Sequence, residues 1–261
     1  MLDVHPPHQA AHSWKDFLIH IATIVVGLLI AVGLEQGVEI LHHRHQRQEL
    51  QQNLQQDSDE NRDYANEDLK RGQAIMDWAH EQAVRIDQAG PTGPVSMRPL
   101  ALSGGIDVYP PNNGIWTAAK LNGEVSLLPP WEQNWLTDFD RVETQTFLSE
   151  TVYIGHLRAC LSELNQLLRD HITLQSDGLM DLSQLNPAQR TKVVEQLEAV
   201  AEAARRLEQG VITYAAYNEF IFHNPYGPPG ADSTTDEQHY LAIAARIAAQ
   251  HPNSEYAFIK P

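Results

Sequence analysis

The most pronounced apolar stretch of the chain lies near its N-terminus. Residues 17–34, FLIHIATIVVGLLIAVGL, contain no formally charged side chain. As an α-helix these 18 residues are about 27 Å long, close to the ~30 Å hydrocarbon core of a bilayer. Trp14 and Lys15 precede the run and suit the membrane interface. We therefore predict an N-terminal tail over residues 1–16 and a transmembrane helix over residues 17–40.

Two alternatives to a membrane span stay open for this stretch. The core helix of a soluble protein can be apolar, although cores rarely need so long an uncharged run. A cleaved signal peptide is also apolar, but the residues before the run lack a basic cluster. Ala31, Val32 and Gly33 are only a loose match to a cleavage site. A permanent single span is the interpretation that we favour.

Small side chains recur along one face of this helix. Thr23, Gly27 and Ala31 are spaced four residues apart, which places them on the same side. Small residues let two helix backbones approach closely in lipid, and this favours self-association. The alternative is that Gly, Ala and Thr are simply common in membrane spans. The pattern predicts a homo-oligomer without fixing its size.

Beyond the apolar run the pattern becomes that of a solvated helix. No proline occurs between Leu34 and Pro91, so the helix can continue past the membrane. Residues 41–63 are rich in Gln, Asn and charged side chains, with few leucines. We predict a polar helical stalk, or a weak coiled coil, over residues 41–68, and a helical bundle domain over residues 69–261.

In the bundle domain, apolar side chains recur at steps of three and four residues, the spacing of packed helices. The clearest series is Val193, Leu197, Val200, Ala204, Leu207, Val211 and Tyr214. Prolines and glycines exclude a regular helix over residues 90–114. Helices are predicted over residues 115–122, 130–171, 187–222 and 235–250, the third of them broken by HNPYGPPG at residues 223–230. The fold class is therefore all-α: an N-terminal transmembrane helix that continues into a stalk, then an antiparallel helical bundle with one long irregular loop.

Composition narrows the range of partners. The formal net charge is −16, so the phosphate backbone of a nucleic acid would be repelled. The single cysteine, Cys160, has no internal disulfide partner. With 42% apolar and 20% charged residues, most of the chain is typical of a globular protein.

Two segments carry a resemblance to known sequences. Residues 12–45, HSWKDFLIHIATIVVGLLIAVGLEQGVEILHHRH, resemble the N-terminus of bacterial N-terminally anchored single-pass membrane proteins of unknown function. Residues 115–128, IWTAAKLNGEVSLL, are similar to a helix–glycine–apolar segment of related anchored families. The resemblance implies a bacterial cytoplasmic membrane, and it transfers no catalytic residue and no cofactor.

The histidines after the span are the best candidate for metal chemistry. On a helix, His42, His45 and Glu49 fall within a ~60° sector, which a divalent metal could use across a dimer. Histidines at a membrane exit more often form a polar collar that touches lipid headgroups. The chain contains no phosphate loop, nucleophile elbow or zinc-protease motif, so we expect no enzyme and no cofactor.

Tryptophans provide the second candidate site. Trp116, Trp131 and Trp135 lie close in sequence and could line a ligand pocket. Tryptophan at helical spacing is more often part of a packed core. Both interpretations place these rings inside the bundle domain.

Three functional hypotheses follow from these patterns. The first is a membrane-anchored helical scaffold that acts through protein contacts and self-association. The second is an extracytoplasmic ligand-sensing domain with a Trp-lined pocket, and the third is a metal-dependent enzyme. Lys15 adjoins the span, whereas Arg44 and Arg47 lie farther from it, so we expect the main domain outside the cytoplasm.

Overall fold

The structure is a computed structural model that describes residues 14–101, 111–169, 173–174, 178–224 and 233–251. The chain forms two compact units, Met1–Gln51 and Gln52–Pro261. Most of the predicted N-terminal tail, residues 1–13, lies outside the described residues.

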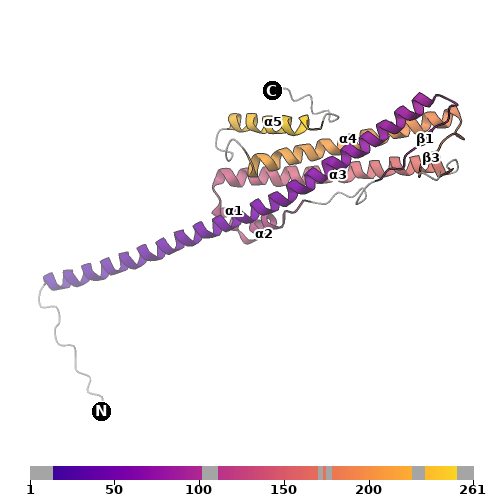
Figure 1. The fold of residues 1–261 in the computed structure, drawn as a ribbon. Coiled ribbons are helices and arrows are strands. Elements are labelled where there is room, and N and C mark those ends of the chain that lie inside the picture. The colour runs from indigo at the N-terminus through magenta and orange to yellow at the C-terminus, as the bar shows by residue number, and fades with distance from the viewer. Residues whose placement is uncertain (1–13, 102–110, 170–172, 175–177, 225–232, 252–261) are drawn as a thin grey trace, which may run out of the picture. The chain divides into compact units, whose positions relative to one another are not determined.

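The described residues are almost entirely helical, which confirms the all-α fold class (Figure 1). Three two-residue strands form the only sheet within these residues, in the order β1-β3-β2. The helices are α1 (Trp14–Ala89), α2 (Gly114–Asn122), α3 (Pro130–Arg169), α4 (Pro187–Phe222) and α5 (Ser233–Ala249), with a 3-10 turn η1 (Glu124–Leu127). The strands are β1 (Ser96–Met97), β2 (Thr173–Leu174) and β3 (Met180–Asp181).

The N-terminal unit consists of the first part of α1. Among the described residues, α1 is the one helix long and apolar enough to span a membrane. Its most apolar 18-residue window has a mean hydropathy of 2.6, and none of that window is buried by other protein atoms. An apolar surface of this length without protein cover is what a lipid-facing segment requires.

The boundary between the units falls within the predicted stalk. The bundle unit begins at Gln52, and Leu54, Ser58 and Asn61 are all buried in it. The structure thus adds residues 52–68 to the packed part of the chain. Their buried face is hard to recognise in the sequence because three of its five residues, Ser58, Asn61 and Asp68, are polar.

The bundle unit packs α3 antiparallel to α4, and α5 against α4 (Figure 1). Gln196, early in α4, donates a hydrogen bond from Nε2 to the carbonyl oxygen of Cys160, late in α3, at 3.0 Å. Gly210, late in α4, lies against Glu150, earlier in α3. The predicted antiparallel packing of these two helices is therefore confirmed.

Helix ends follow local signals in the sequence. Asn186 caps α4: its side chain accepts from the backbone N–H of Gln189 at 2.9 Å, and Gln189 Oε1 accepts from the Asn186 N–H at 2.9 Å. Such a capping box, followed by proline, fixes where a helix begins. At the end of α2, Gly123 has a φ of 76°, a left-handed conformation that glycine adopts without strain.

Candidate functional site

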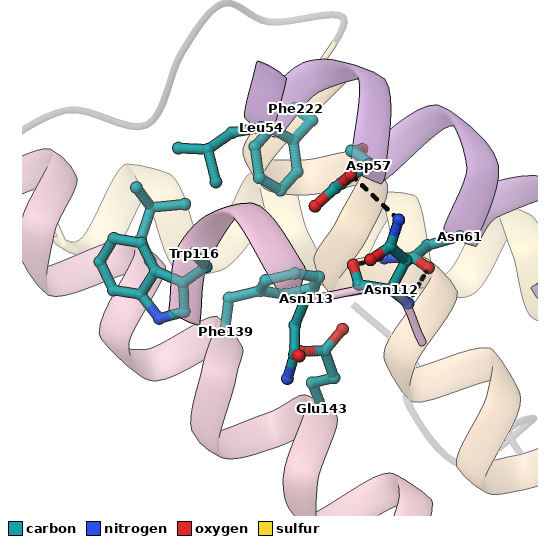
Figure 2. A pocket seen from close by; sticks show the side chains of 11 residues that line it. Leu54, Asp57, Asn61, Asn112, Asn113, Trp116, Phe139, Glu143 and Phe222 are labelled. Atoms are coloured by element: carbon teal, nitrogen blue, oxygen red, sulfur yellow. Dashed lines mark hydrogen bonds between the residues drawn. The ribbon is translucent and has the colours of Figure 1, made fainter. Parts of the chain in front are cut away.

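A small cavity in the bundle unit is the strongest candidate site. Its volume is about 20 Å³, which is room for one water-sized group. Figure 2 shows Asn61 and Asn112 on one side and Trp116 on the other, with Phe139 and Phe222 between them. The lining residues come from α1, the start of α2, α3 and the end of α4: Leu54, Asp57, Ser58, Asn61, Asn112, Asn113, Trp116, Leu136, Phe139, Glu143 and Phe222.

Helix α1 holds the segment that enters α2 against this cavity. The Asn61 side chain donates to the carbonyl oxygen of Asn112 at 2.9 Å and accepts from its backbone N–H at 2.6 Å. Asp57 accepts from the Asn112 side chain at 3.1 Å and from the backbone N–H of Ile115 at 3.3 Å. Asp57 and Asn61 lie four residues apart on one helix face, so α1 positions the mouth of the cavity.

The same face of α1 is joined to the end of α4. The Ser58 hydroxyl donates to Asn218 Oδ1 at 2.9 Å, and the Asn218 amide donates to the Ser58 carbonyl oxygen at 3.0 Å. His223 Nε2 lies 3.1 Å from the Ser58 hydroxyl oxygen. Ser58 and Asn218 are 2% and 1% exposed, so these bonds satisfy polar groups that water cannot reach.

Glu143 of α3 supplies a buried carboxylate to the cavity. Its side chain is 3% exposed, and its Oε1 atom has no hydrogen-bond partner in the described part of the chain. Burial raises the pKa of Glu143 to about 7, against the lowering effect of the Asn113 side chain. Burial also raises the pKa of Asp57, against the lowering effect of the Ile115 N–H. Both carboxyls are therefore costly to ionise without a cationic partner.

Aromatic rings also line the cavity. Trp116 is 6% exposed, and its indole Nε1 has no hydrogen-bond partner among the described residues. The Phe139 ring packs edge-on against Phe222, with ring centroids 5.7 Å apart. Lys120 places its Nζ atom 5.7 Å from the centre of the Trp116 ring, while it also binds Asp140 at 3.0 and 3.1 Å.

A second cavity of about 20 Å³ shares Asn61 with the first. Asp68 of α1, Glu150 of α3 and Tyr214 of α4 are among its lining residues. Burial raises the pKa of Asp68 to about 6 and that of Glu150 to about 8, and in Glu150 the neighbouring Asp68 adds to the rise. Burial and the carboxyl groups of Glu143 and Glu150 raise the pKa of the Tyr214 hydroxyl.

On α4, Glu208 is a further buried carboxyl, after Asp68, Glu143 and Glu150. It is fully buried, and burial raises its pKa to about 7. Its Oε1 atom lies 3.1 Å from Nδ1 of His251. The Cβ of Glu208 also lies 3.7 Å from the Cβ position that a side chain at Gly72 would occupy, so α1 and α4 are close here.

Of the three tryptophans predicted to line a pocket, Trp116 lines the first cavity. Trp131 is 37% exposed and is not among the residues that line it. Trp135 packs edge-on against Phe220, with ring centroids 5.1 Å apart, in the apolar cluster around α5. The tryptophans therefore lie in three different environments.

The predicted metal and self-association residues lie on the exposed part of α1. His42, His45 and Glu49 are exposed, and in the described residues no three His, Cys, Asp or Glu side chains are placed to hold a metal ion. A metal shared between two copies of α1 stays a prediction. The Thr23 hydroxyl donates to the Ile19 carbonyl oxygen at 2.9 Å, and nothing lies within 4 Å of a Cβ added at Gly27.

The four buried carboxyls were absent from the sequence-based candidates. The available signal was their spacing: Glu143 follows Phe139 by four residues, and Glu150 precedes Ile154 by four. Both flanking residues are buried, so the carboxyls lie on the same helix face. Charged residues in helices are usually exposed, and for that reason the spacing by itself does not predict burial.

Comparisons with known proteins add no relative: no protein-family model, no curated protein and no solved structure matches the chain.

Proposed function

We propose that the chain is a membrane-anchored helical module that acts through protein contacts, first of all with copies of itself. The observation that carries this proposal is α1, one helix that contains the exposed apolar segment and continues to Ala89. The location that we propose is the bacterial cytoplasmic membrane, with the bundle on the extracytoplasmic side, in line with the resemblance of residues 12–45.

Membrane attachment is tested by fractionation. Full-length protein should sediment with membranes and resist carbonate extraction, because the apolar segment is long enough to cross the bilayer. Recovery of the full-length chain in the soluble fraction would overturn the anchor. Sidedness is tested with a reporter that is active only in the cytoplasm, fused after Pro261. Activity of this reporter would reverse the proposed sidedness.

Self-association is supported by the open face of the span. Gly27 and Gly33 have nothing within 4 Å of an added Cβ, so a second helix has room to approach either position. Thr23, Gly27 and Ala31 share a face that Gly33 does not. Gly27→Leu should therefore weaken dimerisation of the span in a membrane two-hybrid assay, and Gly33→Leu, the matched control, should weaken it less. Equal signals from wild type and Gly27→Leu would remove this contact from the proposal.

A ligand-sensing domain is the second candidate, and the first cavity favours it. Trp116 lines this cavity, and the unpartnered Glu143 oxygen offers a polar contact that the described part of the bundle does not use. The third hypothesis, a metal-dependent enzyme, rests on His42, His45 and Glu49. Changing both histidines to Gln should leave the metal content of the purified protein unchanged if they are only a polar collar.

A further inference from the structure

The first cavity combines features that select for positive charge. Asp57 and Glu143 contribute carboxyl groups, and no Lys, Arg or His stands among the described residues that line it. The remaining polar side chains, Ser58, Asn61 and the two asparagines before α2, can accept hydrogen bonds from a donor. An anion would meet two carboxyl groups and no cationic lining side chain here, so the cavity disfavours anions.

Two buried polar atoms at the cavity are unpartnered among the described residues. Glu143 Oε1 is one of them, and Figure 2 shows the Glu143 carboxyl group turned toward the space beside Asn113 and Phe139. A buried acceptor without a partner opposes folding, and does so more strongly when it is charged. Trp116 Nε1 is the other, from a different helix. A bound group that donates hydrogen bonds and carries a positive charge would remove the cost at Glu143.

The aromatic side of the cavity distinguishes between kinds of cation. Trp116, Phe139 and Phe222 present rings, whose faces attract ammonium groups but cannot coordinate a metal ion. Calcium takes six to eight oxygen ligands, and magnesium demands an octahedron of them. A nitrogen cation uses both sides of this cavity, because its N–H groups donate to carboxylates while its charge lies against rings.

We propose that the cavity lined by Glu143, Asp57 and Trp116 binds the ammonium group of a small primary amine. The inference rests on the second candidate function, in which this cavity is the sensing site. A volume of about 20 Å³ admits one –NH₃⁺ group and excludes a quaternary ammonium. Asn112 and Asn113 are exposed at the mouth, so the carbon chain of the amine can extend toward solvent.

Binding of the amine should be linked to the protonation state of Glu143. The charged and titratable groups around the cavity are Asp57 and Glu60 on α1, Lys120 on α2, Asp140 and Glu143 on α3, Tyr214 on α4, and His223 at the end of α4, beside Ser58. Burial lowers the pKa of His223. The amine binds the ionised form of Glu143, whose pKa is raised to about 7, mainly by burial. Affinity should therefore increase as the pH rises through that value, and binding should release a proton from Glu143 below it.

The test is a calorimetric titration of the full chain in detergent micelles with methylammonium chloride at pH 8. Sodium chloride at matched ionic strength and tetramethylammonium chloride serve as the comparison cations. We expect saturable one-to-one binding of methylammonium that is at least about tenfold weaker at pH 5.5, and no saturable heat with the other two salts. Absence of saturable methylammonium binding up to about 10 mM would overturn the proposal, and so would equal binding of sodium.

Variants locate the binding. Glu143→Gln keeps the shape and removes the charge, and should weaken methylammonium binding about tenfold to a hundredfold. Glu163→Gln, an exposed change on the same helix, is the matched control and should bind as wild type. Trp116→Leu should weaken binding about fivefold through loss of the ring face. Wild-type affinity in Glu143→Gln would place any observed binding elsewhere and overturn the proposal.

Two further controls keep the result interpretable. If Glu143→Gln does not fold, Asp57→Asn at the more exposed mouth replaces it, with the same expected direction and a loss of about fivefold or more. Circular dichroism establishes folding in each variant. If methylammonium does not bind, the amine proposal fails, but the membrane and dimerisation tests are unaffected. If the chain is not anchored in a membrane, the proposed function fails, but methylammonium binding to the purified chain should be unchanged.

Discussion

The interior of the bundle has an apolar part and a polar part, and both are built from the same three helices. In the apolar part, Ile75, Leu157 and Leu197 belong to a cluster of buried hydrocarbon side chains. In the polar part, buried carboxyls replace hydrocarbon on α1, α3 and α4: Asp68, Glu143, Glu150 and Glu208. Because the helices continue from one part into the other, the difference comes from the side chains.

The two parts therefore differ in what they contribute to folding stability. Burying hydrocarbon stabilises the fold by roughly 25 cal/mol per Å², whereas a buried carboxyl without a cationic partner opposes folding. The apolar part thus supplies stability against the cost of burying Glu143 and Glu150. Asp68 and Glu208 differ, because Arg71 lies 3.6 Å from Asp68 and His251 lies 3.1 Å from Glu208. A packed core has no structural need for the 3%-exposed Glu143 or the 6%-exposed Glu150, so their positions at two small cavities suggest a role in binding or in response to pH.

The largest expected effect is a dependence of the free energy of unfolding on pH, which comes from the polar part and not from the apolar part. The raised carboxyl pKa values, about 8 for Glu150, about 7 for Glu143 and Glu208 and about 6 for Asp68, mean that the folded chain binds more protons than the unfolded chain. The free energy of unfolding should therefore be highest near pH 4.5 and fall toward pH 8, by up to about 1.4 kcal/mol per pH unit for each such carboxyl. Urea denaturation of the bundle, followed by circular dichroism, measures it. A flat or rising profile would contradict the buried-acid interpretation.

The apolar part should respond strongly to truncation and not to pH. Leu157 is fully buried, so Leu157→Ala should lower the free energy of unfolding by about 3 kcal/mol at pH 5 and pH 8 alike. Leu148→Ala, on the same helix but 60% exposed, is the control and should change stability by less than about 0.5 kcal/mol. Equal effects of the two substitutions would mean that α3 does not bury the face described above.

In the polar part, removal of a buried carboxylate charge should stabilise the folded chain. Glu150→Gln keeps the volume and cannot ionise, so it should raise the free energy of unfolding by about 2 kcal/mol at pH 8. At pH 5 the wild-type carboxyl is protonated in the folded chain, and the two proteins should differ little. Glu163→Gln should show no such pH dependence, because Glu163 is exposed. A destabilised Glu150→Gln at pH 8 would show that Glu150 has a cationic partner.

The apolar part and the helix ends could be predicted from the sequence. Val193, Leu197 and Val200 follow steps of four and three, and all three are completely buried. Asn186 before a proline indicated the start of α4, which the capping box confirms. Apolar periodicity and capping residues are local signals, so one sequence is enough to recognise them.

The cavity could not be predicted, because its parts come from distant segments. Asp57 and Asn61 were assigned to a solvated stalk, and no local pattern reveals that they hold Asn112, about fifty residues later. Of the three tryptophans in the pocket hypothesis, only Trp116 is among the residues that line this cavity, since ring spacing along a helix does not show which face is buried; ligand binding by any of them stays a prediction. Acidic side chains are rarely buried, so a prediction that follows residue frequencies assigns Glu143 and Glu150 to the surface.

The smallest expected effect concerns the helix end that begins the apolar part. Asn186→Ala removes the side-chain acceptor for the Gln189 N–H, a bond of 2.9 Å, and should lower the free energy of unfolding by about 1 kcal/mol. Asn186→Asp retains an acceptor and should recover most of that loss. Neither the cap nor its neighbours include a buried carboxyl, so the change should be the same at pH 5 and pH 8, as measured by urea denaturation. The cap is also remote in sequence from Glu150, and the effects of Asn186→Ala and Glu150→Gln should add to within about 0.5 kcal/mol. If the cost of Asn186→Ala instead varied with pH, the polar part would be coupled to the start of α4, and the two parts of the interior could not be treated as separate contributors to stability.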